Sequence, residues 1–393
     1  MEYRMKMRYT IIIGLAACWM MVYSAVAQNR LKESLSFVPA DSVVVWSGDR
    51  SDLKVLALSV DNGLKGQTVT AGAEERKNFK DRFRQWQTET APSLDFIGRC
   101  RAEGIDTVVA VAHACRLSGE LFLQTGESRY MDLVERCAFN YLTSRTEASL
   151  PLSFEKRMAA RALMDISGMM YATDEEGIFV NFFVNNTTHV KTSNLDFVID
   201  QLTALPYGNR LKIRISGLKN GRTPLTVRFR MPDWALASAA TAMRYHYCGE
   251  KQGLPDIYVN GRSEDLPVVG GYVVVKRLWN NGDEIYLDFP VAPLHLQQKA
   301  SGGATAVGGW QYGPLAYGSA EPFHLSHPVS VFSYEVLPME EPNEWGHDVF
   351  GIQVTDGTSQ KRQWLLEPMT DAGKHVEINE TPCQCVAGTF SRK

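Results

Sequence analysis

The stretch Leu225-Thr-Val-Arg-Phe-Arg-Met-Pro-Asp-Trp-Ala235 alternates apolar and charged side chains and then stops at a proline. Such alternation is typical of a β-strand with one buried side and one side in water. Three more strands follow at Ile257-Tyr-Val-Asn-Gly261, Gly271-Tyr-Val-Val-Val-Lys-Arg-Leu-Trp279 and Asn281-Gly-Asp-Glu-Ile-Tyr-Leu-Asp-Phe-Pro290. Gly and Asn-Gly turns separate them, and these turns favour hairpins. The region from Leu225 to Pro290 is therefore predicted to be an antiparallel sheet with hairpins at its corners.

Composition and charge place the chain among ordinary globular proteins. It has 393 residues, of which 45% are hydrophobic and 22% are charged, and this length is enough for two or three cores. The formal net charge is −3 and the pI is about 6.3. This balance gives no electrostatic reason to expect nucleic acid or an anionic membrane as partner. A neutral ligand or a protein surface is expected instead.

The N-terminus has the pattern of an export signal. Basic residues precede the apolar run Ile11 to Val22, and Ala25-Val-Ala27 supplies the small residues that a signal peptidase recognises. The run is shorter than the roughly 20 apolar residues of a membrane span. We expect cleavage after Ala27 and an exported protein without a transmembrane span, in the periplasm or outside the cell. A lipoprotein-like Leu15-Ala-Ala-Cys18 also occurs, but the residues after Cys18 stay apolar, so cleavage is favoured over lipidation.

Six cysteines follow the leader, an even number in a compartment that permits disulfides. They are Cys100, Cys115, Cys137, Cys248, Cys383 and Cys385. Spacing does not fix their connectivity. The pair Cys383-Gln-Cys385 together with a histidine such as His347 or His375 would suit zinc. A second close pair to complete such a site is not found in the sequence, so we expect no metal there.

The segment from Asp106 to Ala172 is predicted to be helical. Apolar residues repeat at helical spacing on both sides of Thr125-Gly126, which predicts a pair of antiparallel helices joined at that glycine. A third helix follows, with Met158, Ala162 and Ile166 on one face. Residues 28 to 100 are less regular, with a candidate strand at Ser42 to Trp46 and a candidate charged helix at Glu74 to Thr88.

The order of these elements resembles the C-terminal half of glycoside hydrolase family 127 (GH127), the bacterial β-L-arabinofuranosidases. The resemblance implies helices of an (α/α)6 toroid followed by β-sandwich modules. It rests on Leu121-Phe-Leu-Gln-Thr-Gly126, Tyr130-Met-Asp-Leu-Val-Glu-Arg-Cys-Ala-Phe-Asn140, Tyr171-Ala-Thr-Asp-Glu-Glu-Gly-Ile-Phe-Val-Asn181, Met231-Pro-Asp-Trp234, the hairpin from Gly271-Tyr to Gly282-Asp and Gly313-Pro-Leu-Ala-Tyr317.

The resemblance also implies a zinc site with a cysteine nucleophile, built from a Glu-x-Cys and a Cys-Cys-Pro at the starts of two helices. Zinc keeps such thiolates deprotonated, so that one of them can attack a sugar. In this chain the Glu-x-Cys positions correspond to Thr107 and Val109, and the paired cysteines to Phe154 and Glu155. We therefore expect the zinc site to be lost and the chain to hold no cofactor.

Length supports a partial toroid. Twelve helices need on the order of 300 residues, whereas 145 residues lie from Gln28 to Ala172. The expected α+β chain has a signal peptide at 1–27, an N-terminal region of undetermined fold at 28–100, a helical remnant of the (α/α)6 barrel at 101–172, a β-sandwich at 173–300 and a C-terminal β module at 301–393. Apolar faces of an incomplete ring need a cover, which residues 28 to 100, a protein partner or a second copy would supply.

Other residues offer candidates for catalysis and binding. A glycosidase without the zinc site needs two carboxyl groups across the scissile bond, and the candidates are Glu155, Asp106 and Glu103, with Glu74 and Glu75 further upstream. Glu155 and Asp106 also suit helix N-termini, where an acidic side chain is stabilising. For sugar binding the candidates are Trp310 and Tyr312 beside a pair of glycines, and Arg161, which matches an arginine after the family's paired cysteines.

Our interpretation is an exported GH127-like protein without the zinc-thiolate site, acting as a carbohydrate-associated accessory or interaction protein. Two alternatives stay open. The chain is an active glycoside hydrolase on arabinose-type glycans with a different carboxylate pair, or it is a piece of a decayed reading frame. The sequence does not decide whether the chain is an enzyme.

Overall fold

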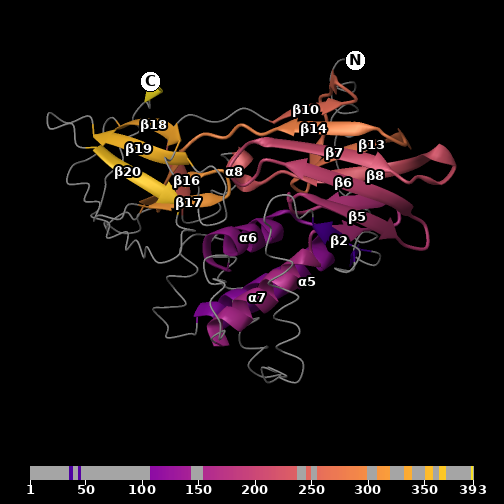
Figure 1. Cartoon of the computed structure of the whole chain (residues 1–393), viewed down its shortest axis with the longest axis horizontal. Helices are drawn as coiled ribbons and strands as arrows, with labels where there is room; N and C mark the ends of the chain where they lie inside the picture. Colours follow the sequence, from indigo (N-terminus) through magenta and orange to yellow (C-terminus); the bar gives the residue numbers. More distant parts are fainter. Residues whose placement is uncertain are drawn as a thin grey trace, which may run out of the picture.

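The computed structural model describes residues 35–38, 43–45, 107–142, 154–236, 245–248, 255–298, 308–318, 332–338, 350–356, 363–368 and 391–392. Within these residues, helices gather on one side of a pair of stacked sheets, and a further sheet lies at the C-terminal end (Figure 1). The expected signal peptide, the candidate helix Glu74 to Thr88 and Cys383-Gln-Cys385 lie outside the described residues.

The predicted helical pair is confirmed. Helix α5 is Thr107–Thr125 and α6 is Arg129–Cys137, which continues into the π-helical turn η2, Ala138–Leu142. Gly126 ends α5 with φ of 69°, a left-handed conformation that glycine adopts without strain, and its N–H bonds Phe122 O at 2.7 Å. The third predicted helix is α7, Phe154–Ser167.

The inner sheet lies between the helices and the second sheet. Its strand order is β1-β3-β4-β8-β13-β12. The strands are β1 Ser36–Phe37, β3 Tyr171–Thr173, β4 Gly177–Val180, β8 Arg222–Arg230, β13 Tyr272–Asn280 and β12 Val268–Val269. Strands β4 and β8 are parallel, and the other pairs are antiparallel. On the helix side, Phe122 of α5 meets Phe179 edge-on at 5.9 Å between ring centroids.

The outer sheet packs on the other face of the inner sheet, and the two share one apolar core. Its strand order is β11-β10-β14-β7-β6-β5-β2, antiparallel throughout. The strands are β2 Val43–Val45, β5 Asn186–Lys191, β6 Asp196–Thr203, β7 Arg210–Ser216, β10 Asp256–Val259, β11 Arg262–Ser263 and β14 Glu284–Asp288. Strand β2 confirms the candidate at Ser42 to Trp46. Strand β7 buries alternate residues, so the other side of this sheet faces water.

The predicted hairpin at Asn281-Gly282 is wrong. Strand β13 belongs to the inner sheet and β14 to the outer sheet, so this turn passes the chain from one sheet to the other. Asn281 N–H bonds Gly221 O at 3.0 Å and Gly282 N–H bonds Ile215 O at 2.8 Å, which fixes the turn against both sheets. The Asn260-Gly261 turn does form a hairpin, between β10 and β11, with φ of 50° and 76°.

Strand β8 also differs from its prediction, because both of its faces are buried. Every residue from Leu225 to Arg230 is buried, and Arg228 and Arg230 are 9% and 0% exposed. Arg230 pairs with Asp132 and Glu135 of α6, and Arg228 pairs with Asp174 and Glu176 of the turn between β3 and β4. These acidic residues compensate the charge of the two arginines, which is the condition for burying an arginine.

The C-terminal sheet has the order β21-β18-β19-β20-β17-β16-β15-β9. Its strands are β9 Tyr245–Cys248, β15 Leu294–Gln298, β16 Gly308–Tyr312, β17 Leu315–Gly318, β18 Phe332–Pro338, β19 Phe350–Asp356, β20 Gln363–Pro368 and β21 Ser391–Arg392. Strands β9 and β15 fall in the range expected for the sandwich, yet both pair within this sheet. Short helices α8 Asp233–Leu236 and η4 Lys219–Gly221 flank β8.

Candidate functional site

Helices α5 and α7 lie side by side and run in the same direction. Arg116 of α5 pairs with Asp165 of α7, with Nη2 and Oδ2 2.7 Å apart. One turn further along, Gly119 lies against Met169, just after α7, where a Cβ on the glycine would stand 2.9 Å from Met169 Cε. The two helices are therefore parallel, and their first turns lie at the same end of the pair.

The positions that the resemblance matches to the GH127 zinc site fall in these first turns. Thr107 and Val109 open α5, and Phe154 and Glu155 open α7. The backbone thus brings the two halves of the corresponding site to one end of a helix pair. The residues found there, Thr107, Val109, Phe154 and Glu155, supply none of the thiol groups that the resemblance implies.

The buried thiols of the helical pair do not replace them. Cys115 of α5 and Cys137 of α6 are both buried. Contact with Cys137 and burial raise the pKa of the Cys115 thiol well above its usual value. A thiol kept protonated in this way is a poor nucleophile and a poor metal ligand. Across the described parts of the chain, no cluster of three or more His, Cys, Asp or Glu residues suits a metal ion.

Of the candidates for catalysis and binding in the helical region, Arg161 lies on the surface of the helices. Glu155 begins α7, where an acidic residue is expected, while Asp106 and Glu103 fall outside the described residues. Arg161 has a side chain 48% exposed, and its Nε lies 3.4 Å from Asp165 Oδ1. Arg161 and Arg116 therefore share Asp165 on the surface of the helical pair.

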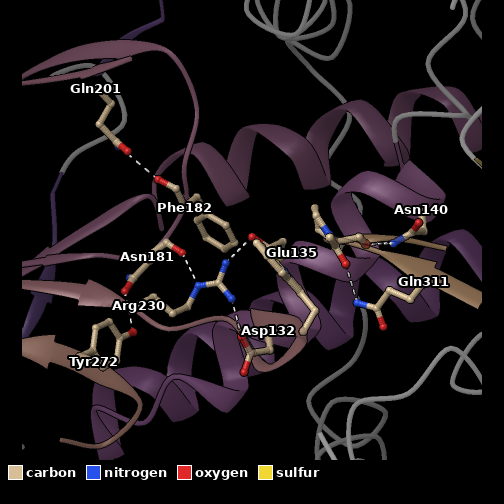
Figure 2. A network of polar contacts seen from close by, with 12 residues as sticks. Asp132, Glu135, Asn140, Asn181, Phe182, Gln201, Arg230, Tyr272 and Gln311 are labelled. Atoms are coloured by element: carbon tan, nitrogen blue, oxygen red, sulfur yellow. Dashed lines mark hydrogen bonds and ion pairs between the residues drawn. The ribbon is translucent and has the colours of Figure 1, made fainter. Parts of the chain in front are cut away.

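The strongest electrostatic feature is a buried ion cluster between α6 and the inner sheet (Figure 2). Arg230 of β8 is 0% exposed. Its Nη1 and Nη2 donate to Asp132 and Glu135, and its Nε donates to Asn181 O at 2.6 Å. The guanidinium thus donates to two acidic side chains one helical turn apart and to one carbonyl. Such charge-assisted bonds in a dry site are strong and directional.

A second ion pair adjoins the first. Arg136 Nη2 and Asp233 Oδ2 are 2.7 Å apart, with side chains 9% and 7% exposed. Trp234 Nε1 donates to Glu135 Oε2 at 2.9 Å. Asp233 and Trp234 come from α8, directly after β8, so α6 is bound to both segments. Glu135 and Arg136 are adjacent in sequence, and each has a partner from β8 or α8.

The cluster holds two cations, Arg230 and Arg136, and three carboxyl groups. Burial together with the nearby charge of Asp233 raises the pKa of Asp132 to about 8, although Arg230 acts against this shift. One protonated carboxyl makes the cluster neutral, and a neutral cluster avoids the cost of an uncompensated buried charge. Burial itself opposes the charge of Arg230, but Glu135 and Asp132 outweigh it and raise the pKa of Arg230.

Asn181, just after β4, links the cluster to the sheet. Tyr272 OH donates to Asn181 Oδ1 at 2.8 Å, and Asn181 Nδ2 donates to Met169 O at 3.0 Å. Burial raises the pKa of Tyr272 well above its usual value, so its hydroxyl stays a donor. Asn181 therefore contacts the end of the helical layer, β13 and Arg230 at once.

A separate polar network lies inside the sandwich. Tyr171 OH donates to Asn186 Oδ1 at 2.8 Å and accepts a hydrogen bond from Gln201 Nε2. Gln201 Nε2 also donates to Phe182 O at 3.2 Å, as Figure 2 shows. Burial raises the pKa of Tyr171, although the hydrogen bonds from its partners act in the other direction. This network ties β3, β5 and β6 together.

Asn140 of η2 joins the helices to the C-terminal sheet. Its Nδ2 donates to Pro314 O at 2.9 Å, and its Oδ1 accepts from Ala316 N–H at 2.6 Å. Nearby, Trp310 is 4% exposed and packs with Leu315, Tyr317 and Ile352 in a small core. Tyr312 is half-buried and meets Tyr317 edge-on at 6.3 Å. The packing favours a structural role for the ring of Trp310, the first candidate for sugar stacking.

The ion cluster fixes α6 against β8. Asp132 and Glu135 are two neighbouring carboxyl groups, and the raised pKa of Asp132 is the property that a general acid needs. Both are at most 4% exposed and both are held by Arg230, so no sugar reaches them in this arrangement. The charged residues of β8 and α6 were the signal for the cluster, but the alternation of β8 predicted that its charged face lies in solvent.

Comparison with known proteins identifies the sandwich. Residues 177–291 match the family described as the β-L-arabinofuranosidase GH127 middle domain. The chain is GH127-like. The match runs from the start of β4 to the residues just after β14, and so covers most of both stacked sheets.

Solved GH127 structures share the fold at low sequence identity. A GH127 β-arabinofuranosidase is 18% identical with a TM-score of 0.57, and the match covers 73% of this chain and 50% of that one. A glycoside hydrolase is 16% identical with a TM-score of 0.53 and covers 69% and 50%. A GH127 β-L-arabinofuranosidase from Geobacillus stearothermophilus T6 is 16% identical, with a TM-score of 0.50 and coverage of 73% and 50%. The GH127-like chain thus spans about half the length of these structures.

Curated proteins give no match to the chain. Among the helices that the structure describes, none combines the length and the apolar character needed to cross a bilayer.

Proposed function

We propose that this GH127-like chain is an exported, carbohydrate-associated accessory or interaction protein without hydrolase activity. The proposal rests on one observation above all. The helix starts that the resemblance matches to the family's zinc-thiolate site are at the same end of the parallel helices α5 and α7, and they carry Thr107, Val109, Phe154 and Glu155. Threonine, valine and phenylalanine supply no soft ligand for zinc and no thiolate nucleophile.

The buried ion cluster supports the same proposal. A hydrolase with a carboxylate mechanism needs both acidic groups at the sugar. The acidic pair in this helical layer is engaged by Arg230 and Trp234 and is closed to water. The cluster therefore fits a structural role, in which it holds the helices on the sandwich.

In this proposal α5, α6 and α7 are a remnant of an (α/α)6 toroid. The remnant keeps the part of the toroid that docks on the sandwich through Asp132 and Glu135. A protein partner or a second copy of the chain would then cover helix faces that a complete ring covers with its own helices.

An active glycoside hydrolase is the second candidate, and Asp132 is the observation that favours it. Its pKa of about 8 leaves one protonated carboxyl beside Glu135, as a general acid beside a base would be. This function requires that Arg230 release both groups and that the layer between α6 and β8 open to substrate.

Two assays on the purified chain from Gln28 separate these candidates. The first follows free sugar released from an aryl β-L-arabinofuranoside and from arabinose-containing oligosaccharides, with added zinc and with chelator. The second measures binding of the same oligosaccharides. Binding without release is the expected result. Release that persists with chelator and disappears in Glu135→Gln supports the carboxylate mechanism, and release abolished by chelator contradicts the loss of the zinc site.

A further inference from the structure

A row of large side chains crosses the solvent face of the outer sheet. Tyr258 of β10 is directly opposite Tyr286 of β14, which is opposite Lys212 of β7, which is opposite Leu202 of β6. We call these four residues the tyrosine strip. Adjacent strands are about 4.8 Å apart, so a row over four strands extends roughly 14 Å. That is long enough for an oligosaccharide of several units.

The apolar members of the strip are exposed, and they lie on regular, paired strands. Tyr258, Tyr286 and Leu202 are 37%, 38% and 52% exposed. The neighbouring residues Ile257, Leu287 and Leu211 point the other way and are buried in the sandwich core. The strip is therefore a continuous row on the solvent face of the outer sheet, and the opposite face of the sheet is buried in the core.

Contacts with charged neighbours hold the central ring in place. Tyr286 OH donates to Glu284 Oε2 at 2.9 Å, and Lys212 Nζ donates to Glu284 Oε1 at 2.8 Å. Lys212 Nζ also lies 5.2 Å from the centroid of the Tyr286 ring, within the range of a cation–π contact. A ring fixed before binding loses less conformational entropy when a ligand stacks on it.

Polar rows border the strip on both sides. Asp256, Asp288 and Arg210 are opposite one another on one side, and Glu284, Arg214 and Asp200 on the other. Arg210 pairs with Asp288 at 3.7 Å, and Asp200 accepts from Thr187 at 2.7 Å. With Lys212 the surface has four acidic and three basic groups, so it presents no strong net charge. Such a surface offers hydrogen-bond donors and acceptors and does not attract a polyanion.

We propose that the tyrosine strip is a binding site for a neutral oligosaccharide. The C–H faces of sugars stack on the rings of Tyr258 and Tyr286, and sugar hydroxyls exchange hydrogen bonds with the bordering rows. The inference rests on the proposed carbohydrate-associated function and adds to it the site and the charge class of the ligand. The site lies on the sandwich, away from the helix starts that correspond to the zinc site.

The test compares the wild type with Tyr258→Thr, Tyr286→Thr and the double variant. Threonine keeps the β-branched character that strands favour but removes the ring. Val269→Thr is the matched control, because Val269 is 63% exposed on β12 of the inner sheet, outside the strip. Binding of neutral arabinose-containing oligosaccharides and of a sulfated polysaccharide is measured by calorimetry, with thermal melting and sedimentation as checks of fold and oligomeric state.

The double variant is expected to bind the neutral oligosaccharide about tenfold more weakly or worse, each single variant a few-fold more weakly, and the control like the wild type. The sulfated polysaccharide is expected to bind none of them. Wild-type affinity in a folded double variant overturns the strip and leaves the proposed function standing. Absence of binding in the wild type contradicts both. A double variant that turns a dimer into a monomer also overturns the proposal, because the strip is then a contact between copies.

Discussion

The substitution Asp132→Asn tests whether the Asp132 side chain in the buried ion cluster is protonated in the folded chain. Asp132 lies between Arg230, which donates to it, and Asp233, whose charge helps burial to raise its pKa to about 8. In the unfolded chain the same group has a value near 3.8. Asparagine has nearly the shape of the protonated aspartate and carries no charge at any pH. The variant therefore keeps the neutral cluster while removing the titration.

The sign follows from proton binding in the two states. Between about pH 4 and about pH 8 the folded chain keeps the Asp132 proton and the unfolded chain has lost it, so unfolding releases a proton. The free energy of unfolding then falls as pH rises, by up to about 1.4 kcal/mol per pH unit from this group. Between about pH 5 and about pH 7.5 the loss is on the order of 3 kcal/mol. Above the folded pKa the contribution of Asp132 stops changing.

Urea unfolding at several pH values in this window measures the effect. The difference in free energy of unfolding between Asp132→Asn and wild type should grow in favour of the variant as pH rises. Asp165→Asn is the control, since Asp165 is 26% exposed and pairs with Arg116 on the helix surface. Parallel curves for wild type and Asp132→Asn would refute the reasoning, because they would mean that Asp132 is ionised in the folded chain.

Three further predictions concern the ion cluster and the packing. Arg230→Met leaves two buried carboxyl groups without their cation and should cost about 3–5 kcal/mol in urea unfolding; a loss below about 1 kcal/mol would show that the cluster is dispensable. Gly177→Ala places a Cβ 1.8 Å from Thr226 O, a backbone atom, and should lower Tm far more than Gly126→Ala, which has open space and only the strain of φ +69°. Equal Tm losses in the two glycine variants would contradict the close approach of β4 and β8. Trp310→Ala should cost about 3–5 kcal/mol by emptying the small core and leave oligosaccharide affinity unchanged; weaker binding at unchanged stability would restore Trp310 as a ligand contact.

Local features of the fold were predictable from the sequence. The break at Gly126, the α5 and α6 pair, and the Asn260-Gly261 hairpin depend on residues close together in the chain. Helical periodicity and positive-φ turns express such local preferences directly. The sandwich could be predicted by resemblance, and the family match at residues 177–291 agrees with it.

Long-range features were not predictable in the same way. Arg230 meets Asp132 across 98 residues of sequence, and nothing in the alternation of β8 indicates that its polar face meets a helix. The turn at Asn281-Gly282 has hairpin residues, but its hydrogen bonds to Gly221 and Ile215 place β13 and β14 in different sheets. The tyrosine strip likewise depends on strand register, which spacing along the chain does not give.

The most direct test of the account is one incubation of the purified chain with an arabinose-containing oligosaccharide, followed by separation of the bound fraction and analysis of its sugars. Binding without hydrolysis predicts that the oligosaccharide is retained and recovered intact, with and without zinc. Recovery of shortened oligosaccharide and free sugar would contradict the account, because the chain would then be a hydrolase.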